Sequence, residues 1–309
     1  MSLAFVFPGQ GSQSVGMLDA LAADYAEVES TYREAGMVLD YDLWDIVRNG
    51  PTEKLNSTDI TQPAMLAAGV AVWRVWCSTG GAQPTVMAGH SLGEYTALVC
   101  SDSLTFTDAI KLVAERGRLM QAAVPAGSGA MAAVLGLEDD AVRQACRDAA
   151  AGDVLEAVNF NSPGQVVVAG NKAAVERVVD LAKERGAKRA LVLPVSVPSH
   201  CALMQPAADR LATVLKDVQI QAPTIPVINN VDVASPSDPD TIRDALVRQL
   251  YSPVRWVETI QKMAADGVEN LIECGPGKVL VGLNKRIERN MAAQAVFDPD
   301  SLVAALGKE

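Results

Sequence analysis

Residues 86–95, VMAGHSLGEY, decide the fold of this chain. The first three are apolar and predict a short buried strand, and the glycines that follow predict a sharp turn into a helix beginning near Leu92. The centre is a G-x-S-x-G pentapeptide, which places a serine on a strained turn between a strand and a helix. Gly89 and Gly93 lack a Cβ, so the helix can pack close to the strand. Ser91 is therefore a candidate nucleophile, and the Leu92 N–H points to where an oxyanion would form.

The composition is that of a large α/β protein with one or two domains. The chain has 309 residues, of which 49% are hydrophobic, enough to bury a substantial core. The net charge of −11 argues against nucleic acid and against an anionic membrane surface as partners. No stretch reaches the roughly 18 uncharged apolar residues of a membrane span, and no signal peptide is predicted. We therefore expect a cytoplasmic protein.

The sequence predicts neither a metal site nor a bound cofactor. The five cysteines form no C-x-x-C pair, and only two histidines are present. The loop PGQGSQ at 8–13 begins like a dinucleotide-binding fingerprint, but the third glycine of that fingerprint would fall on Ser14. Taken by itself, this loop is best explained as a plain turn between a strand and a helix.

The order of the predicted elements indicates one domain inserted into another. Strands that alternate with helices predict a mostly parallel sheet, and they lie at residues 3–7, 86–88, 226–229 and 270–274. One helix is predicted at 17–36. The composition at 125–129 predicts a linker. The order βαββαβ, the ferredoxin-like pattern, follows it, with strands at 130–135, 155–160, 165–169 and 189–193. We expect a large domain at 1–124 and 197–309, and a small inserted domain at 125–196.

A nucleophilic serine needs a base, and two histidines are available. His90 is adjacent to Ser91, and neighbours on such a turn rarely face one another, so we assign it to packing or support. His200, in a proline-flanked loop after the small domain, is the better candidate. The acidic residues between Ser91 and His200 lie mostly on predicted helices of the insert. A triad and a dyad whose imidazole is oriented by a carbonyl group both remain open.

Six short motifs are spread through both predicted domains: FPGQGSQ at 7–13, GHSLGE at 89–94, RG at 116–117, NFNSP at 159–163, VPSH at 197–200 and ECGPG at 273–277. Together and in this order they resemble the malonyl-CoA:acyl-carrier-protein transacylases of bacterial type II fatty acid synthesis. G-x-S-x-G alone is shared with many hydrolases, but the full set is specific. The resemblance implies an α/β-hydrolase-like large domain with a mostly parallel sheet, interrupted by a ferredoxin-like small domain.

The resemblance also implies a reaction. A malonyl group would pass from malonyl-CoA to the phosphopantetheine thiol of holo acyl carrier protein by a ping-pong mechanism, supplying fatty acid biosynthesis. Ser91 would carry the malonyl ester and His200 would act as the base. By position in the motifs, Gln10 and Leu92 would supply the N–H groups of the oxyanion hole, which replaces the plain-turn interpretation of the first loop. Malonyl-CoA is a substrate, and no cofactor is implied.

Further roles follow from the same resemblance. Arg116 matches the arginine that binds the malonyl carboxylate, for which a guanidinium can offer two parallel hydrogen bonds. Gln249 matches the residue whose backbone carbonyl orients the histidine, which favours a dyad. Asn161 matches a position near the substrate cleft.

Docking of an acidic carrier protein onto this acidic chain requires a local basic surface. The candidates are the pairs Lys188-Arg189 and Lys285-Arg286, although such pairs are often only solvated ends of helices or strands. A monomer is expected, with neither nucleic acid nor membrane as partner. The alternatives are a serine hydrolase or thioesterase, against which Arg116 argues, and a carrier-binding subunit without catalysis.

Overall fold

A computed structural model describes residues 2–195 and 197–307, and it is built around a five-stranded sheet in which every pairing is parallel. The order is β7-β2-β1-β8-β9. The strands are β1 (Ser2–Phe7), β2 (Val86–Gly89), β7 (Val227–Ile228), β8 (Val268–Cys274) and β9 (Ala292–Val296). The central strand β1 is apolar from Leu3 to Phe7, as expected for a strand of a parallel sheet that is covered on both faces.

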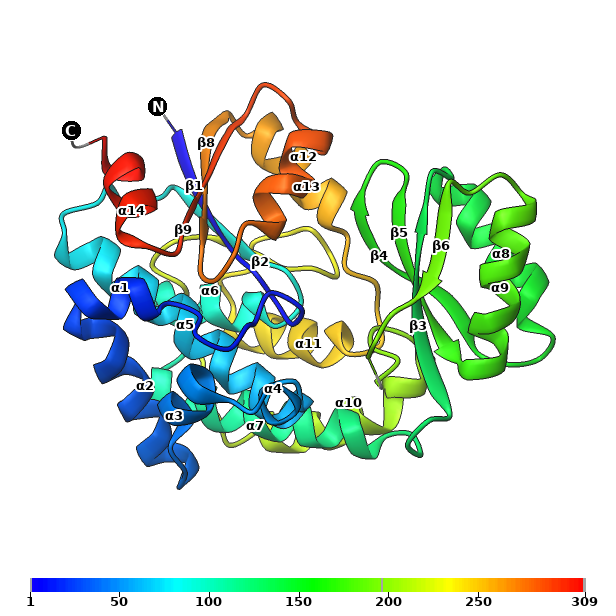
Figure 1. Ribbon diagram of the computed structural model, residues 1–309, viewed down its shortest axis with the longest axis horizontal. Coiled ribbons are helices and arrows are strands. Elements are labelled where there is room, and N and C mark those ends of the chain that lie inside the picture. Colours follow the sequence, from blue (N-terminus) through cyan, green and yellow to red (C-terminus); the bar gives the residue numbers. More distant parts are fainter. Residues whose placement is uncertain (1, 196, 308–309) are drawn as a thin grey trace.

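Helices cover both faces of this sheet (Figure 1). Successive side chains of β1 point to opposite faces, so Phe5 and Phe7 join one buried cluster with α5, whereas Ala4 and Val6 join another with α12 and α13. The helices of this part of the chain are α1 (Asp19–Asp24), α2 (Ala26–Leu39), α3 (Leu43–Asn49), α4 (Thr52–Leu55), α5 (Thr58–Ser78), α6 (Gly93–Cys100), α7 (Phe106–Ala122), α10 (Gln205–Leu215), α11 (Pro239–Gln249), α12 (Trp256–Ala265), α13 (Val279–Ile287) and α14 (Pro299–Leu306), with a 3₁₀ turn at Ala202–Met204. Among the described residues, no helix is both long and apolar enough to cross a membrane.

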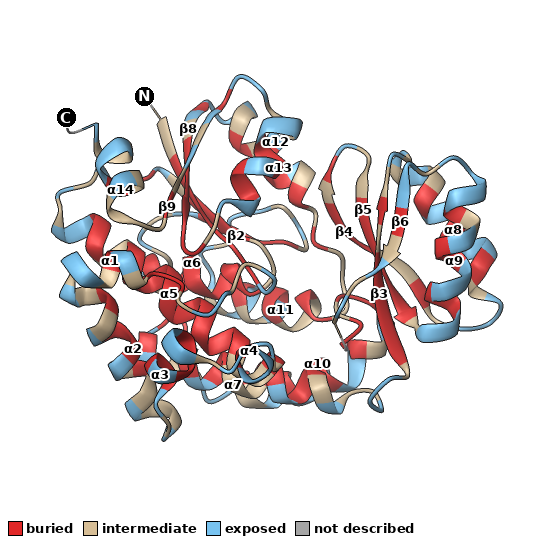
Figure 2. Ribbon diagram, viewed as in Figure 1, coloured by how far each residue is buried: buried red, intermediate tan, exposed pale blue. Residues whose placement is uncertain are grey.

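A separate four-stranded antiparallel sheet has the order β4-β5-β3-β6. Its elements are β3 (Gly129–Leu135), α8 (Asp139–Ala150), β4 (Leu155–Ser162), β5 (Gln165–Asn171), α9 (Lys172–Glu184) and β6 (Arg189–Val192). The helices α8 and α9 pack on its outer face, and their outward sides are exposed (Figure 2). The predicted fold class, a mostly parallel α/β sheet with a βαββαβ unit, is therefore confirmed. The predicted domain boundaries stay a prediction, and Ser196 lies outside the described residues.

The small sheet is fastened to the rest of the molecule through its edge strand β4. The N–H of Phe160 donates to the Val254 carbonyl at 3.0 Å, and the Val254 N–H donates to the Val158 carbonyl at 2.8 Å. Val254 precedes α12, which packs on the parallel sheet. These backbone hydrogen bonds hold β4 beside the carboxyl end of β2, where the candidate nucleophile lies.

Two details of the predicted elements are wrong or missing. The single helix predicted at 17–36 is two helices, because Tyr25 is extended and its N–H ends α1 on the Leu21 carbonyl. The apolar pattern conceals this break, since Leu21 and Val28 are both fully buried. In addition, the sequence pattern predicts no helix or strand beyond the turn at 275–277, where the structure has α13, β9 and α14.

Candidate active site

The turn between β2 and α6 has the strained geometry that the G-x-S-x-G motif predicts. Ser91 has a φ of 51°, in the left-handed region, which costs a residue other than glycine about 1–3 kcal/mol. A Cβ on Gly89 would lie 1.8 Å from the carbonyl carbon of Gly93, and one on Gly93 would lie 2.0 Å from the Phe7 carbonyl oxygen. Both positions therefore require glycine, and the close packing that they permit presents Ser91 to a cavity.

The side chain of Ser91 meets His200 in this cavity. The Oγ atom lies 2.8 Å from Nε2 of His200, and Nδ1 of the same ring lies 2.8 Å from the backbone carbonyl oxygen of Gln249. A carbonyl only accepts, so Nδ1 carries the proton and Nε2 is free to accept one from the serine. The group that orients the imidazole is thus a carbonyl, and the arrangement is a dyad.

Burial keeps His200 neutral. The ring is 2% exposed, and its desolvation, together with the positive charge of Arg116, lowers the pKa of His200 to about 3. The hydrogen bond to the Gln249 carbonyl opposes this shift. The histidine is therefore in the form that accepts a proton at neutral pH.

The second histidine has a different environment. Nε2 of His90 lies 2.8 Å from Oδ1 of Asn161 on β4, and the His90 ring lies 5.5 Å from the ring of Trp256. His90 therefore connects the nucleophile turn to the small sheet, in agreement with its assignment to support. Asn161 lines the same cavity as Ser91.

Arg116 is a buried cation whose guanidinium is held by neutral groups. Nη1 donates to Oε1 of Gln62 at 2.9 Å, and Nη2 donates to Oε1 of Gln249 at 3.0 Å and to Ser91 Oγ at 3.3 Å. The side chain is almost fully buried, and Nε has no partner among the described residues. Such a guanidinium is available to the carboxylate of a ligand. Arg118, by contrast, is exposed and pairs with Glu115.

The cavity lies between the two sheets and has a volume of about 220 Å³. Ser91, His200 and Arg116 line one side of it, and the apolar side chains of Met131 and Val167 come from the small sheet. This volume is below the roughly 300–1,000 Å³ of pockets for drug-sized ligands, so the cavity suits a short acyl group. Within residues 2–195 and 197–307, no three His, Cys, Asp or Glu side chains are placed to hold a metal ion.

The loop after β1 lies against the nucleophile turn. A Cβ on Gly9 would lie 2.4 Å from the His90 carbonyl oxygen and 3.7 Å from the Leu92 nitrogen. Gln10, the next residue, lines the cavity, as does Leu92. The N–H groups of Gln10 and Leu92 donate to no group of the described part of the chain. Two N–H donors are therefore left free beside Ser91.

Three further residues of the site are not predicted from the sequence pattern: Gln62, Glu94 and Asn230. Oδ1 of Asn230 accepts the Ser91 N–H at 2.7 Å, and its Nδ2 donates to the Gly89 carbonyl at 2.7 Å. The Asn230 N–H in turn donates to Oε2 of Glu94 at 2.9 Å. One signal could have pointed to Asn230, because it follows a predicted strand, and carboxyl ends of parallel strands share one edge.

The four basic candidates for docking lie outside the cavity. Lys188, Arg189, Lys285 and Arg286 are all exposed. Leu135 of β3 pairs with Arg189 on one side and with Gln165 on the other, and Nη1 of Arg286 donates to Oε1 of Gln165 at 2.9 Å. Both basic pairs therefore gather at one end of the small sheet.

Comparison with known proteins identifies the family. The model of the acyl transferase domain matches residues 4–297. The malonyl CoA-acyl carrier protein transacylase of Escherichia coli K12 is 59% identical over 98% of both chains, and that of Haemophilus influenzae is 61% identical over 97% of both.

Solved structures agree. An acyl carrier protein S-malonyltransferase from Vibrio cholerae is 63% identical, with a TM-score of 0.96 over 98% of this chain and 99% of that one. The malonyl-transacylase PlMCAT, solved in complex with the type II PKS acyl-carrier protein AntF, is 56% identical, with a TM-score of 0.98 over 99% of each chain. The chain therefore belongs to the acyl transferase family and, within it, to the malonyl CoA-acyl carrier protein transacylases.

Proposed function

We propose that this chain transfers a malonyl group from malonyl-CoA to the phosphopantetheine thiol of holo acyl carrier protein, through a malonyl ester on Ser91. The observation that carries the proposal is the 2.8 Å contact of Ser91 with His200 beside the buried Arg116. A nucleophile with its base accounts for acyl transfer, and the cation accounts for an acyl group that ends in a carboxylate. The relatives named for this reaction support the same substrates.

In the first half-reaction, Oγ of Ser91 attacks the thioester carbonyl carbon and its proton passes to Nε2 of His200. The oxyanion that forms accepts hydrogen bonds from the N–H groups of Gln10 and Leu92. When the tetrahedral intermediate collapses, the C–S bond breaks and the CoA sulfur takes the proton from Nε2. The Gln249 carbonyl holds the Nδ1 proton throughout, which stabilises the imidazolium.

The second half-reaction reverses these steps with a new acceptor. The carrier thiol gives its proton to Nε2 of His200, and its sulfur attacks the ester carbonyl. The bond between this carbon and Oγ of Ser91 then breaks, and Oγ recovers the proton from Nε2. Arg116 holds the malonyl carboxylate through both halves, so the ester remains in place until the thiol arrives. Asn161 borders the cavity and, through His90, holds the small sheet against the turn.

Mass spectrometry of the intact protein tests this function. After brief exposure to malonyl-CoA, the wild-type chain should gain one malonyl group on Ser91, and addition of holo acyl carrier protein should remove it. Ser91→Ala should gain none. Steady CoA release without carrier protein would instead identify a hydrolase. An adduct that persists in Ser91→Ala, or no adduct on the wild type, would overturn the proposal.

A further inference from the structure

Glu94 is a buried carboxylate next to the nucleophile turn, and the proposed mechanism assigns it no role. It lies in the first turn of α6, three residues after Ser91, and is 2% exposed. Its Oε2 atom accepts two hydrogen bonds, from the Asn230 N–H at 2.9 Å and from Nε2 of Gln249 at 2.8 Å. A buried carboxylate costs several kcal/mol by general estimates, so an apolar residue would serve packing alone better.

The two partners of Glu94 hold the two halves of the dyad. The Asn230 side chain binds both ends of the turn around Ser91, through the Ser91 N–H and the Gly89 carbonyl. The Gln249 carbonyl orients His200, and Nε2 of Gln249 also donates to the Ser91 carbonyl at 3.1 Å. One carboxylate oxygen therefore links the support of the nucleophile to the support of the base.

The carboxylate also fixes which way the Gln249 amide faces. An ionised carboxylate only accepts hydrogen bonds, so Nε2 of Gln249 turns toward Glu94 and Oε1 turns toward Arg116. Arg116 donates to that Oε1 at 3.0 Å. Glu94 is thus the internal counter-charge of the buried Arg116, one amide group away.

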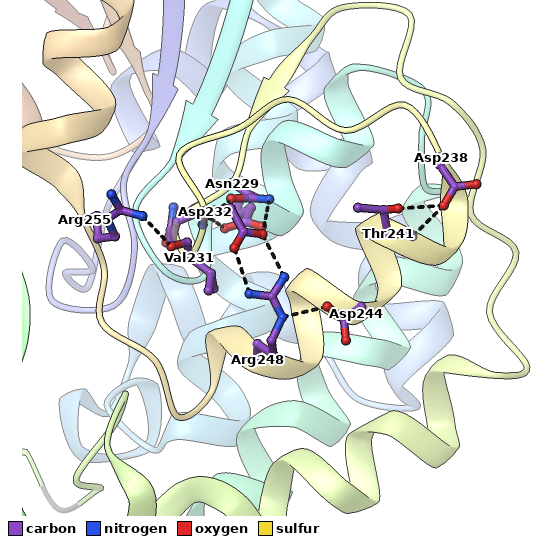
Figure 3. A network of polar contacts seen from close by, with 10 residues as sticks. Asn229, Val231, Asp232, Asp238, Thr241, Asp244, Arg248 and Arg255 are labelled. Atoms are coloured by element: carbon purple, nitrogen blue, oxygen red, sulfur yellow. Dashed lines mark hydrogen bonds and ion pairs between the residues drawn. The ribbon is translucent and has the colours of Figure 1, made fainter.

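Outside the cavity, a set of ion pairs holds the same two supports together (Figure 3). Both oxygens of Asp232 accept from Arg248, at 2.9 and 2.7 Å, and Arg248 also pairs with Asp244 at 2.6 Å. Asp232 lies two residues after Asn230, and Arg248 precedes Gln249. The loop that carries one partner of Glu94 is therefore fastened to the helix that carries the other.

We propose that Glu94 is a positioning residue, whose carboxylate sets the placement of Ser91 relative to His200 through Asn230 and Gln249. This role rests on the proposed transferase function.

Glu94→Gln removes the charge and keeps the shape and one acceptor oxygen. It should lower the rate of malonyl-Ser91 formation by about 10- to 100-fold, the loss expected for a misplaced reacting group. KM for malonyl-CoA should change little, because Glu94 does not line the cavity.

Glu273→Gln is the matched control. Glu273 is also fully buried, on β8, and its Oε2 accepts the Val281 N–H in the first turn of α13 at 2.8 Å; it contacts neither member of the dyad. Both variants are compared with wild type by quenched single-turnover mass spectrometry and by thermal unfolding. The proposal expects Glu273→Gln to lose stability and keep the acylation rate.

The outcomes separate the proposal from a purely structural role. A folded Glu94→Gln that acylates at the wild-type rate, or whose loss only matches its unfolded fraction, would overturn the role of Glu94. If Glu94→Gln does not fold, Asn230→Ser tests the same link, since a hydroxyl cannot bridge the Ser91 N–H and the Gly89 carbonyl together; an unchanged rate there also overturns it. A wild-type chain that forms no malonyl adduct would overturn the transferase function instead.

Discussion

Arg116 is the residue to which we assign the choice of acyl group. Its guanidinium faces the cavity with neutral amides as partners, so the malonyl carboxylate would be its first direct counter-ion. Arg116→Ala should reduce kcat/KM for malonyl-CoA by the equivalent of about 2–5 kcal/mol, and it should leave kcat/KM for acetyl-CoA nearly unchanged. Competition between the two thioesters measures the difference. Arg118→Ala, on the same helix but exposed, is the control, and an equal loss for both thioesters would contradict the assignment.

The pH dependence of acylation separates His200 from Glu94. The pKa of His200 is lowered to about 3, against about 6.5 for a free histidine. Its neutral form, which accepts the proton, therefore persists as pH falls. Burial raises the pKa of Glu94 to about 7, and Asp232 adds to the shift, whereas its two hydrogen bonds and the charge of Arg116 oppose it. The nearby phenol of Tyr95 has its own pKa raised to about 12 and stays neutral.

We therefore expect the decline of kcat/KM at acid pH to follow the protonation of Glu94. As pH falls through about 7, the protonated carboxyl becomes equivalent to the amide of Glu94→Gln. Wild-type kcat/KM for malonyl-CoA should therefore decline toward the level of Glu94→Gln, whose own profile stays flat to about pH 5. A decline of kcat/KM with an apparent pKa near 6.5 in both proteins would assign the titration to His200 instead.

At the scale of elements, the pair Asp232–Arg248 fastens the loop after β7 to the end of α11. Both side chains are about one-third exposed, so solvent screening limits the pair to about 1 kcal/mol or less. Arg248 lowers the pKa of Asp232, so the stabilisation is present above the unfolded-state pKa and is lost as pH falls through the folded one. Arg248→Met should therefore reduce the free energy of unfolding at pH 7, and its difference from wild type should shrink as pH falls below the unfolded-state pKa of about 3.9. Urea unfolding of both proteins at pH 7 and near about pH 3 measures this difference. An equal loss of unfolding free energy at the two pH values would show that the ion pair is not its cause.

The limits of sequence-based prediction are also clearest for elements. Ser91 and His200 could be paired because a G-x-S-x-G serine needs a base and the chain has two histidines. Glu94 and Asn230 could not be paired from the sequence, because they are distant in it and meet only where β7 lies beside β2. The strand β9 escapes detection because its AAQAV sequence has no buried apolar run and only Val296 is fully buried.

For the whole molecule, the acidic charge leaves few places where an acidic carrier protein could dock. The pairs Lys188-Arg189 and Lys285-Arg286 gather at one end of the small sheet. Reversing the charge of Lys285 and Arg286 to Glu should raise KM for the carrier protein several-fold and leave CoA release from malonyl-CoA unchanged, because rim charges act mainly on association.

The control for this prediction reverses two arginines at the opposite end of the molecule. Arg33 and Arg48 are exposed on α2 and α3, far from the small sheet in Figure 1. The same change of net charge there should leave KM for the carrier protein unchanged. If both double variants raise it equally, net charge and not a docking surface is responsible.

The guanidinium of Arg116, which forms no direct ion pair among the described residues, also couples the bound malonyl group to the stability of the fold. A malonyl group on Ser91 would bring its carboxylate to the buried guanidinium of Arg116, and because this contact can form only in the native state, it would stabilise that state. The malonylated protein should therefore melt at a higher temperature than the free protein, and Arg116→Ala should abolish the difference. During turnover the enzyme would alternate between a less stable and a more stable form, and its resistance to unfolding would follow the supply of malonyl-CoA.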